Sequence, residues 1–325
     1  MIQMRKTIYC EIDFVESLLK RMDRKYDPWD DDWVEGDYAR KILVELMSYE
    51  YIIVYFDDET KFRKLYMDNE RFRKMVDKSE MSEGYAQLTC GQYIPLNSKD
   101  SPLNAVYFSM AEDEIAAQKG IMVLTPTTIN NPSLYKDSGS GGIKKGKPFS
   151  WDKLLKNAQH CCNALIAVDN YLYKGRQNNL FPILNSLLPQ RLQEGISFQL
   201  SLFMLEEPGR NIETIYSQIM EYLTNVRPAL VVDLTIYKCY KTEFHDRAII
   251  TNNMWIECVG GFDLLKNDKY GFRTVSSKTT KTHLTFPFIV KDGSTDSYSL
   301  LLEDVENVRK IEREFKGSDK NRLFY

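Results

Sequence analysis

The chain has 325 residues, of which 43% are hydrophobic and 27% are charged, a balance typical of folded proteins and unlike that of long disordered segments. Its net charge of -3 excludes a surface that attracts nucleic acid as a whole, so any polyanion site must be a local basic patch. The length favours two domains, each large enough to bury its own core.

The sequence contains no apolar run that approaches the ~20 residues needed to span a bilayer, and residues 1–5 lack the apolar core of a signal peptide. Its six cysteines show no C-x-x-C spacing, and the adjacent pair Cys161 and Cys162 is poorly placed to form a disulfide. We therefore expect a cytoplasmic protein with reduced thiols and without a zinc site.

The first part of the chain has the pattern of an α/β domain, in which apolar runs of strand length alternate with helical segments. An acidic loop around residues 27–32 fits neither period. Gly120 is expected to end a helix. The expected strands are 6–14, 51–56, 103–110 and 121–125, and the expected helices are 37–48, 61–78 and 111–119, of which 61–78 is highly charged and exposed.

A domain boundary is predicted at residues 130–147, which contain the run SGSGGIKKGKP, rich in Gly, Ser and Lys and without apolar periodicity. We therefore predict an α/β domain over residues 1–130, a linker over 131–149 and a second domain over 150–325. The same composition also suits a mobile loop that covers a site.

Strands alternate with helices in the second half as well, which predicts a mainly parallel sheet covered by helices, extended by a final antiparallel hairpin. Ligands of such sheets bind at the carboxyl ends of the strands. The expected strands are 164–169, 197–205, 229–236, 247–251 and 254–259, and the expected helices are 150–159, 180–188 and 212–225.

Residues 244–266, with the sequence FHDRAIITNNMWIECVGGFDLLK, contain a histidine motif. The segment resembles the motif H-x-K-x-x-x-x-D of the phospholipase D superfamily, which is followed by a short strand and a glycine-containing turn. His245 takes the histidine place, Arg247 the lysine place and Asn252 the aspartate place, and Gly260 begins the turn. The order of strands and helices suits that fold, so the resemblance covers about residues 150–305.

The segment is still more similar to a bacterial variant of this fold in which histidine and arginine are joined as H-D-R. That variant commonly ends its second strand in G-x-S, where this chain has Phe262 in the serine place. The resemblance implies a phospholipase D-like mixed sheet for the second domain. It also implies a setting among prokaryotic mobile-element and antiviral defence proteins.

The resemblance implies a phosphohistidine mechanism, in which a neutral imidazole attacks phosphorus, a second histidine protonates the leaving oxygen and basic side chains hold the phosphate. His245 would be the nucleophile and Arg247 a bidentate phosphate clamp. Asn252, in the third catalytic place, carries no charge that could stabilise an imidazolium. Two motifs are needed for one active site, and neither His160 nor His283 has the spacing. An enzyme would therefore require a homodimer that joins two copies of His245.

Further residues are candidates for substrate binding. Asp246 and Gly260 belong to the motif itself, and Asp246 is placed to support an imidazolium. The run SSKTTKTH supplies Lys278, Lys281 and His283, which we expect in a polar basic loop that adds phosphate contacts. A solvated loop without a ligand is the alternative interpretation.

Structural roles also stay open for the two central motif residues. His245 would suit a hydrogen-bonded position at the start of a strand. Arg247 would equally suit an ion pair with Asp233 or Asp246 inside an α/β sheet. Neither residue alone decides between ligand binding and a structural role.

Carboxylates follow the first two strands of the chain, where Asp13 and Asp57 lie beside Glu11 and Asp58. Clustered oxygen ligands at adjacent strand ends would suit Mg²⁺. Acidic residues after strands also serve as turn formers and helix caps, so Asp13 and Asp57 are only secondary metal candidates. The sequence indicates no cofactor.

Three functions fit these observations. The first is a phosphodiester-binding, nucleic-acid-sensing module on an inactive phospholipase D-like fold, because Asn252 and Phe262 replace motif residues. The second is a metal-independent phosphodiesterase or nuclease that works as a homodimer through His245. The third is a scaffold subunit of a larger complex. We favour the first, since a fold alone does not establish activity.

Overall fold

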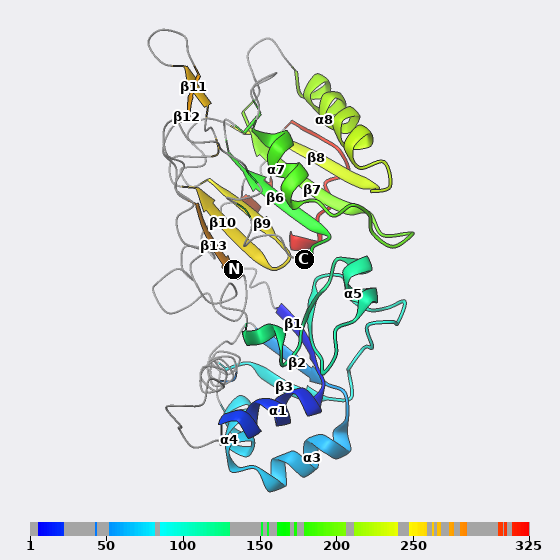
Figure 1. Cartoon of the computed structure of the whole chain (residues 1–325), viewed down its shortest axis with the longest axis vertical. Helices are drawn as coiled ribbons and strands as arrows, with labels where there is room; N and C mark the ends of the chain where they lie inside the picture. The colour runs from blue at the N-terminus through cyan, green and yellow to red at the C-terminus, as the bar shows by residue number, and fades with distance from the viewer. Residues whose placement is uncertain are drawn as a thin grey trace. The chain divides into compact units, whose positions relative to one another are not determined.

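The computed structural model divides into two compact units, Met1–Leu134 with Phe286–Phe288, and Tyr135–Thr285 with Ile289–Tyr325 (Figure 1). Both contain a sheet and helices, so the chain is an α/β protein, as the sequence predicts. The structure describes residues 6–22, 43, 52–81, 85–130, 151, 155, 161–169, 172–173, 179–205, 211–239, 247–258, 262, 265–267, 273–275, 280–284, 305–307, 309–310 and 314–324, with only the backbone for 130, 258, 265–267, 273–275 and 280–284.

Several predicted segments fall outside these residues, namely the acidic loop at 27–32, the linker at 131–149 and most of the helices at 37–48 and 150–159. Within the part of the chain that the structure describes, no helix is both long and apolar enough to cross a membrane.

The first unit is built on a five-stranded sheet in the order β3-β2-β1-β4-β5, with every neighbouring pair parallel. The chain moves outward from β1 to β3 and then returns to β4 on the other side of β1. The strand order therefore reverses between β1 and β4, which is where ligands bind in many open parallel sheets. The strands are β1 (Lys6–Cys10), β2 (Ile52–Phe56), β3 (Gln87–Cys90), β4 (Ala105–Phe108) and β5 (Met122–Leu124).

Helices and loops cover both faces of this sheet. Phe14 stacks on Phe108 with ring centroids 4.9 Å apart, on the face covered by α1. On the other face Tyr9 stacks on Tyr107 at 5.0 Å, in a cluster that includes Ala116 of α5. The helical elements are α1 (Ile12–Met22), α3 (Glu59–Asp68), α4 (Glu70–Met81), α5 (Glu114–Lys119) and the 3-10 turn η1 (Thr128–Asn130).

Local sequence explains two departures from the predicted elements and one agreement. The predicted strand 6–14 is wrong beyond Cys10, because Ile12, Val15 and Leu19 have helical spacing and are buried on one face of α1. The predicted helix 61–78 is two helices, because Asn69 ends α3 and its side chain caps α4 by accepting from the amide of Phe72 at 3.0 Å. Gly120, with φ of 68°, ends α5 as predicted.

The second unit is built on a seven-stranded mixed sheet in the order β13-β10-β9-β6-β7-β8-β14. Strands β6, β7 and β8 are parallel, and all the other neighbours are antiparallel. The antiparallel part is thus larger than the predicted hairpin. The strands are β6 (Ala164–Val168), β7 (Phe198–Met204), β8 (Val232–Lys238), β9 (Ala248–Thr251), β10 (Met254–Cys258), β13 (Thr280–Leu284) and β14 (Phe315–Lys316), and a separate pair is β11 (Leu265–Asn267) and β12 (Arg273–Val275).

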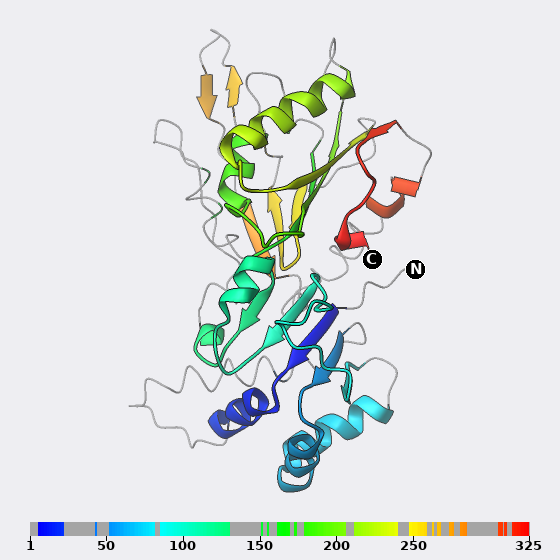
Figure 2. The same cartoon turned by 90° about the vertical axis from the view of Figure 1, so that its right-hand side faces the viewer.

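Alternate residues of the central strands serve two different layers. Leu200 and Leu202 of β7 join the core formed with α7 (Leu180–Leu187) and α8 (Ile212–Val226). Phe203 points to the opposite face, where it meets Phe324 of the 3-10 turn η5 (Arg322–Phe324) edge-on. Figure 2 shows the C-terminal segment on the opposite side of the sheet from α7 and α8.

The C-terminal segment is tied to the sheet by polar side chains, of which Asn321 is buried and Arg322 is partly buried. Asn321 donates to the carbonyl of Leu165 at 3.1 Å, and Arg322 donates to the carbonyls of Asn163 and Ser197 at 2.5 and 3.2 Å. Burial lowers the pKa of Arg322, although a guanidinium stays charged at neutral pH. This tail therefore belongs to the fold of the second unit.

Candidate functional site

The edge of the second sheet at the carboxyl end of β6 is organised by Asp169. This residue directly follows β6 and is 0% exposed. Its Oδ2 accepts a hydrogen bond from the amide of Phe262 at 2.7 Å, and its Oδ1 lies 3.7 Å from Nε of Arg247. A buried carboxylate therefore faces both the arginine of the H-D-R motif and the turn that follows β10.

Arg247 reaches this edge because β9 runs antiparallel to β6. Ala248, the first residue of β9, pairs with Val168, the last residue of β6. The residue before β9 therefore lies at the carboxyl end of β6. The Arg247 side chain faces the buried Asp169 carboxylate with its Nε. It is 25% exposed, so part of it remains accessible to solvent.

Four of the candidate residues lie outside the described residues. These are His245, Asp246 and Gly260, together with Lys278 of the basic run. Their predicted roles stay predictions.

Lys281 and His283 lie in a strand, so the prediction of a basic loop is wrong for these two positions. Both belong to β13, where Lys281 pairs with Glu257 and His283 with Trp255 of β10. Because Glu257 in turn pairs with Ala248, the backbone of Lys281 lies two strand spacings, roughly 10 Å, from the start of β9. The structure thus brings Lys281 and Arg247 to the same end of the sheet.

Asn252 lies at the opposite end of β9 from Arg247. Five residue steps along the chain separate the two, roughly 16 Å for an extended strand. The Asn252 Oδ1 accepts hydrogen bonds from the amides of Asn163 and Ala164, both at 2.9 Å. The structure therefore separates Asn252 from the candidate phosphate site and gives it a structural role at the amino end of β6.

Phe262, which replaces the serine of the related motif, is fully buried at 0% exposure. Its ring packs against Trp151 with centroids 6.3 Å apart. Only its backbone amide contributes to the edge described above. Asp169 is the residue that the motif analysis missed, although an acid directly after a buried strand is a signal for this position.

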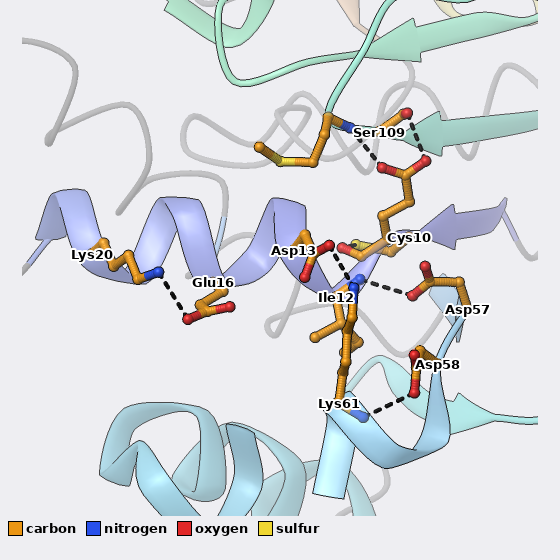
Figure 3. A network of polar contacts seen from close by, with 11 residues as sticks. Cys10, Ile12, Asp13, Glu16, Lys20, Asp57, Asp58, Lys61 and Ser109 are labelled. Atoms are coloured by element: carbon orange, nitrogen blue, oxygen red, sulfur yellow. Dashed lines mark hydrogen bonds and ion pairs between the residues drawn. The ribbon is translucent and has the colours of Figure 1, made fainter. Parts of the chain in front are cut away.

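Charged residues also gather at the carboxyl end of the first sheet, around the reversal between β1 and β4 (Figure 3). Glu11 follows β1, and its carboxylate accepts from the Ser109 hydroxyl and the Met110 amide, both at 2.7 Å. These two residues follow β4. Glu11 therefore ties the ends of β1 and β4 together.

The two secondary metal candidates are engaged in protein contacts at the same edge (Figure 3). Asp57 accepts from the amide of Ile12 at 2.9 Å, at the start of α1, while Asp13 pairs with Lys61 at 2.6 Å. The hydrogen bond that Lys61 donates to the Asp13 carboxylate raises the pKa of Lys61. Among the described residues, no group of three or more His, Cys, Asp and Glu side chains is arranged to hold a metal ion.

Comparison with protein-family models gave no match for this chain, and comparison with curated protein sequences gave none either.

Proposed function

We propose that the second unit binds a phosphate group of a nucleotide or nucleic acid at the carboxyl end of β6, with Arg247 as the anion-binding side chain. The observation that carries this proposal is the combination of a partly exposed arginine with a fully buried carboxylate beneath it. A guanidinium held in one orientation matches the oxygens of a phosphate better than a freely rotating one.

Two features of the surroundings support the proposal. The site lies at the carboxyl ends of parallel strands, where ligands of α/β sheets bind. The backbone of Lys281 lies at the same end of the sheet as Arg247. The H-D-R motif adds His245 from the sequence.

The first unit is a poorer place for an anion. The amide of Ile12, at the start of α1, is already taken by the Asp57 carboxylate. Helix N-termini attract phosphate through such amides, and here carboxylates of the protein replace the ligand. This contrast favours the second unit as the phosphate site.

The test is binding of the purified full-length chain to labelled single-stranded and double-stranded DNA and RNA, in the presence and absence of a chelator. Arg247→Gln is the central variant, and we expect it to weaken binding about tenfold or more. Arg63→Gln is its matched control, because Arg63 lies on α3 of the first unit with a side chain that is 77% exposed. It removes the same charge and should leave affinity unchanged.

Equal affinity of the wild type and Arg247→Gln would contradict the proposal. A His245→Ala variant separates binding from catalysis in the same experiment. Chelator-resistant cleavage by the wild type that this variant abolishes would replace the binding module by a phosphodiesterase, which would need a homodimer. Binding without cleavage would support the proposed binding function.

A further inference from the structure

We infer that Asp169 is a positioning residue of the Arg247 site: its buried carboxylate orients the guanidinium and anchors the turn at Phe262, so ligand affinity depends on a side chain that the ligand does not touch. This inference rests on the proposed function of the same edge. It adds a residue outside the H-D-R motif to the phosphate site.

Three segments that are distant in sequence converge on this carboxylate. Asp169 directly follows β6, Arg247 precedes β9, and Phe262 follows β10. With 0% exposure, Asp169 has no surface through which a ligand could contact it. Its influence on a ligand can therefore pass through Arg247 or through the backbone of Phe262.

The backbone of Asp169 is itself held in place. Its amide donates to the carbonyl of Phe203 at the end of β7 at 3.2 Å, and its carbonyl accepts from the amide of Leu172 at 3.2 Å. The carboxylate is thus attached to a fixed strand end. A long, flexible arginine side chain loses rotamer freedom when such an anchor holds it. Because this entropy is lost on folding, it does not weaken ligand binding.

The buried position also explains why the carboxylate must be paired. An ionised carboxylate away from water is costly unless hydrogen-bond donors and a counter-charge compensate it. The amide of Phe262 at 2.7 Å and the guanidinium of Arg247 at 3.7 Å supply a donor and a counter-charge. The ion pair therefore favours arginine orientations in which the guanidinium faces Asp169.

A competing role for Asp169 predicts the opposite change in anion affinity when its charge is removed. If its charge merely neutralised Arg247, then removing that charge would raise the positive potential at the edge and strengthen anion binding. Positioning predicts that the same change weakens anion binding. The near-isosteric Asp169→Asn variant therefore separates the two roles.

The experiment uses the full-length chain and a fluorescein-labelled single-stranded oligonucleotide, with affinity measured by fluorescence anisotropy. We expect Asp169→Asn to weaken binding about tenfold, close to the effect of Arg247→Gln. Asp233→Asn is the matched control, since Asp233 lies in β8 in line with Gln199 and Ala164, towards the amino end of the sheet. It removes the same charge and should leave affinity unchanged.

A double-mutant cycle shows whether Asp169 acts through Arg247. Positioning predicts that Asp169→Asn weakens binding in the wild type but adds nothing in the Arg247→Gln background. It also predicts that both single variants lower the salt dependence of binding by about one charge. Additive losses would instead indicate general destabilisation and overturn the inference.

Asp169→Glu is the second variant, because it keeps the charge and lengthens the side chain. Positioning predicts weaker binding for this variant as well. Affinity equal to or tighter than that of the wild type in both Asp169 variants overturns the inference alone, whereas a wild type that binds no oligonucleotide overturns the proposed function with it.

Discussion

The two sheets present charged residues at their carboxyl ends in opposite ways. In the first unit, Glu11 and Asp57 accept hydrogen bonds from backbone amides and hold neighbouring segments together. In the second unit, Asp169 is buried beneath Arg247, which remains partly exposed. The carboxylates at the first edge are engaged in contacts within the protein, whereas the guanidinium of Arg247 at the second edge is partly accessible to solvent.

This difference shows that the position of charged residues after strands does not by itself define a binding site. Carboxylates at the ends of adjacent strands look like metal ligands in the sequence, yet backbone amides and Lys61 occupy them in the structure. What distinguishes the second edge is a charged group that combines a buried partner with solvent access. The predictions below test this distinction.

The largest expected effect is on stability at the first edge. Glu11→Ala removes the acceptor of the Ser109 hydroxyl and the Met110 amide, so we expect a loss of roughly 2 to 4 kcal/mol in the free energy of unfolding. Urea unfolding measures this loss. Glu16→Ala is the control, because Glu16 forms an exposed ion pair with Lys20 on the surface of α1, and its loss should cost less than about 0.5 kcal/mol.

Oligonucleotide affinity should not change in Glu11→Ala under conditions where it stays folded. A loss of affinity in this variant, with stability unchanged, would reverse the assignment of the two edges.

The sequence predicted most of the scaffold and part of the site. Strands such as β6 and β7 were identified within a few residues, because uninterrupted apolar runs indicate buried strands. Arg247 was identified from the H-D-R motif. Asp169 was missed, because its role depends on the pairing of Val168 with Ala248, which is fixed only when β9 folds beside β6.

Other errors have the same physical origin. Asn252 was placed in the catalytic set because it takes the aspartate place of the motif that the segment resembles, whereas in the structure β9 separates it from Arg247 and places it at the opposite edge of the sheet. The basic run appeared to be a loop, because Lys281 and His283 alternate with threonines and no apolar residues mark a strand. The edge strand β13 forms its backbone hydrogen bonds with β10, and the sequence of β13 alone does not indicate this pairing.

An intermediate effect is expected at alkaline pH. Burial, with the nearby carboxylates of Asp57 and Glu11, raises the pKa of Cys10 well above its ordinary value of 9.0. A thiol whose folded-state pKa is raised contributes stability that is fully present below pH 9.0 and declines above it, by up to about 1.4 kcal/mol per pH unit. Cys10→Ala removes this contribution.

The stability difference between wild type and Cys10→Ala should therefore be smaller at pH 10 than at pH 7.5, as measured by chemical unfolding. Cys162 provides the comparison in the second unit, where burial raises the pKa of its thiol to about 12. The stability difference between the wild type and Cys162→Ala should also be smaller at pH 10 than at pH 7.5. A difference that stays constant or widens with pH in Cys10→Ala would contradict the raised pKa of the Cys10 thiol.

A smaller effect is expected from removing the cap of α1. Asp57→Ala should lower the free energy of unfolding by about 1 kcal/mol, because the amide of Ile12 loses its acceptor. Asp58→Ala is a matched variant, since Asp58 caps α3 through the amide of Lys61 at 2.9 Å and should cost a similar amount. Thermal unfolding of both variants measures the costs, and a stabilising Asp57→Ala would show that carboxylate repulsion dominates this edge.

The smallest expected effect is that of magnesium on the first edge. A site with a dissociation constant a hundredfold below the magnesium concentration would raise the free energy of unfolding by about 2.7 kcal/mol. Because Asp13 already pairs with Lys61 and Asp57 with an amide, we expect no measurable rise. Unfolding curves with magnesium and with chelator should coincide. A magnesium-dependent rise that Asp57→Ala abolishes would show that the internal contacts yield to a metal, and the first edge would then be a ligand site after all.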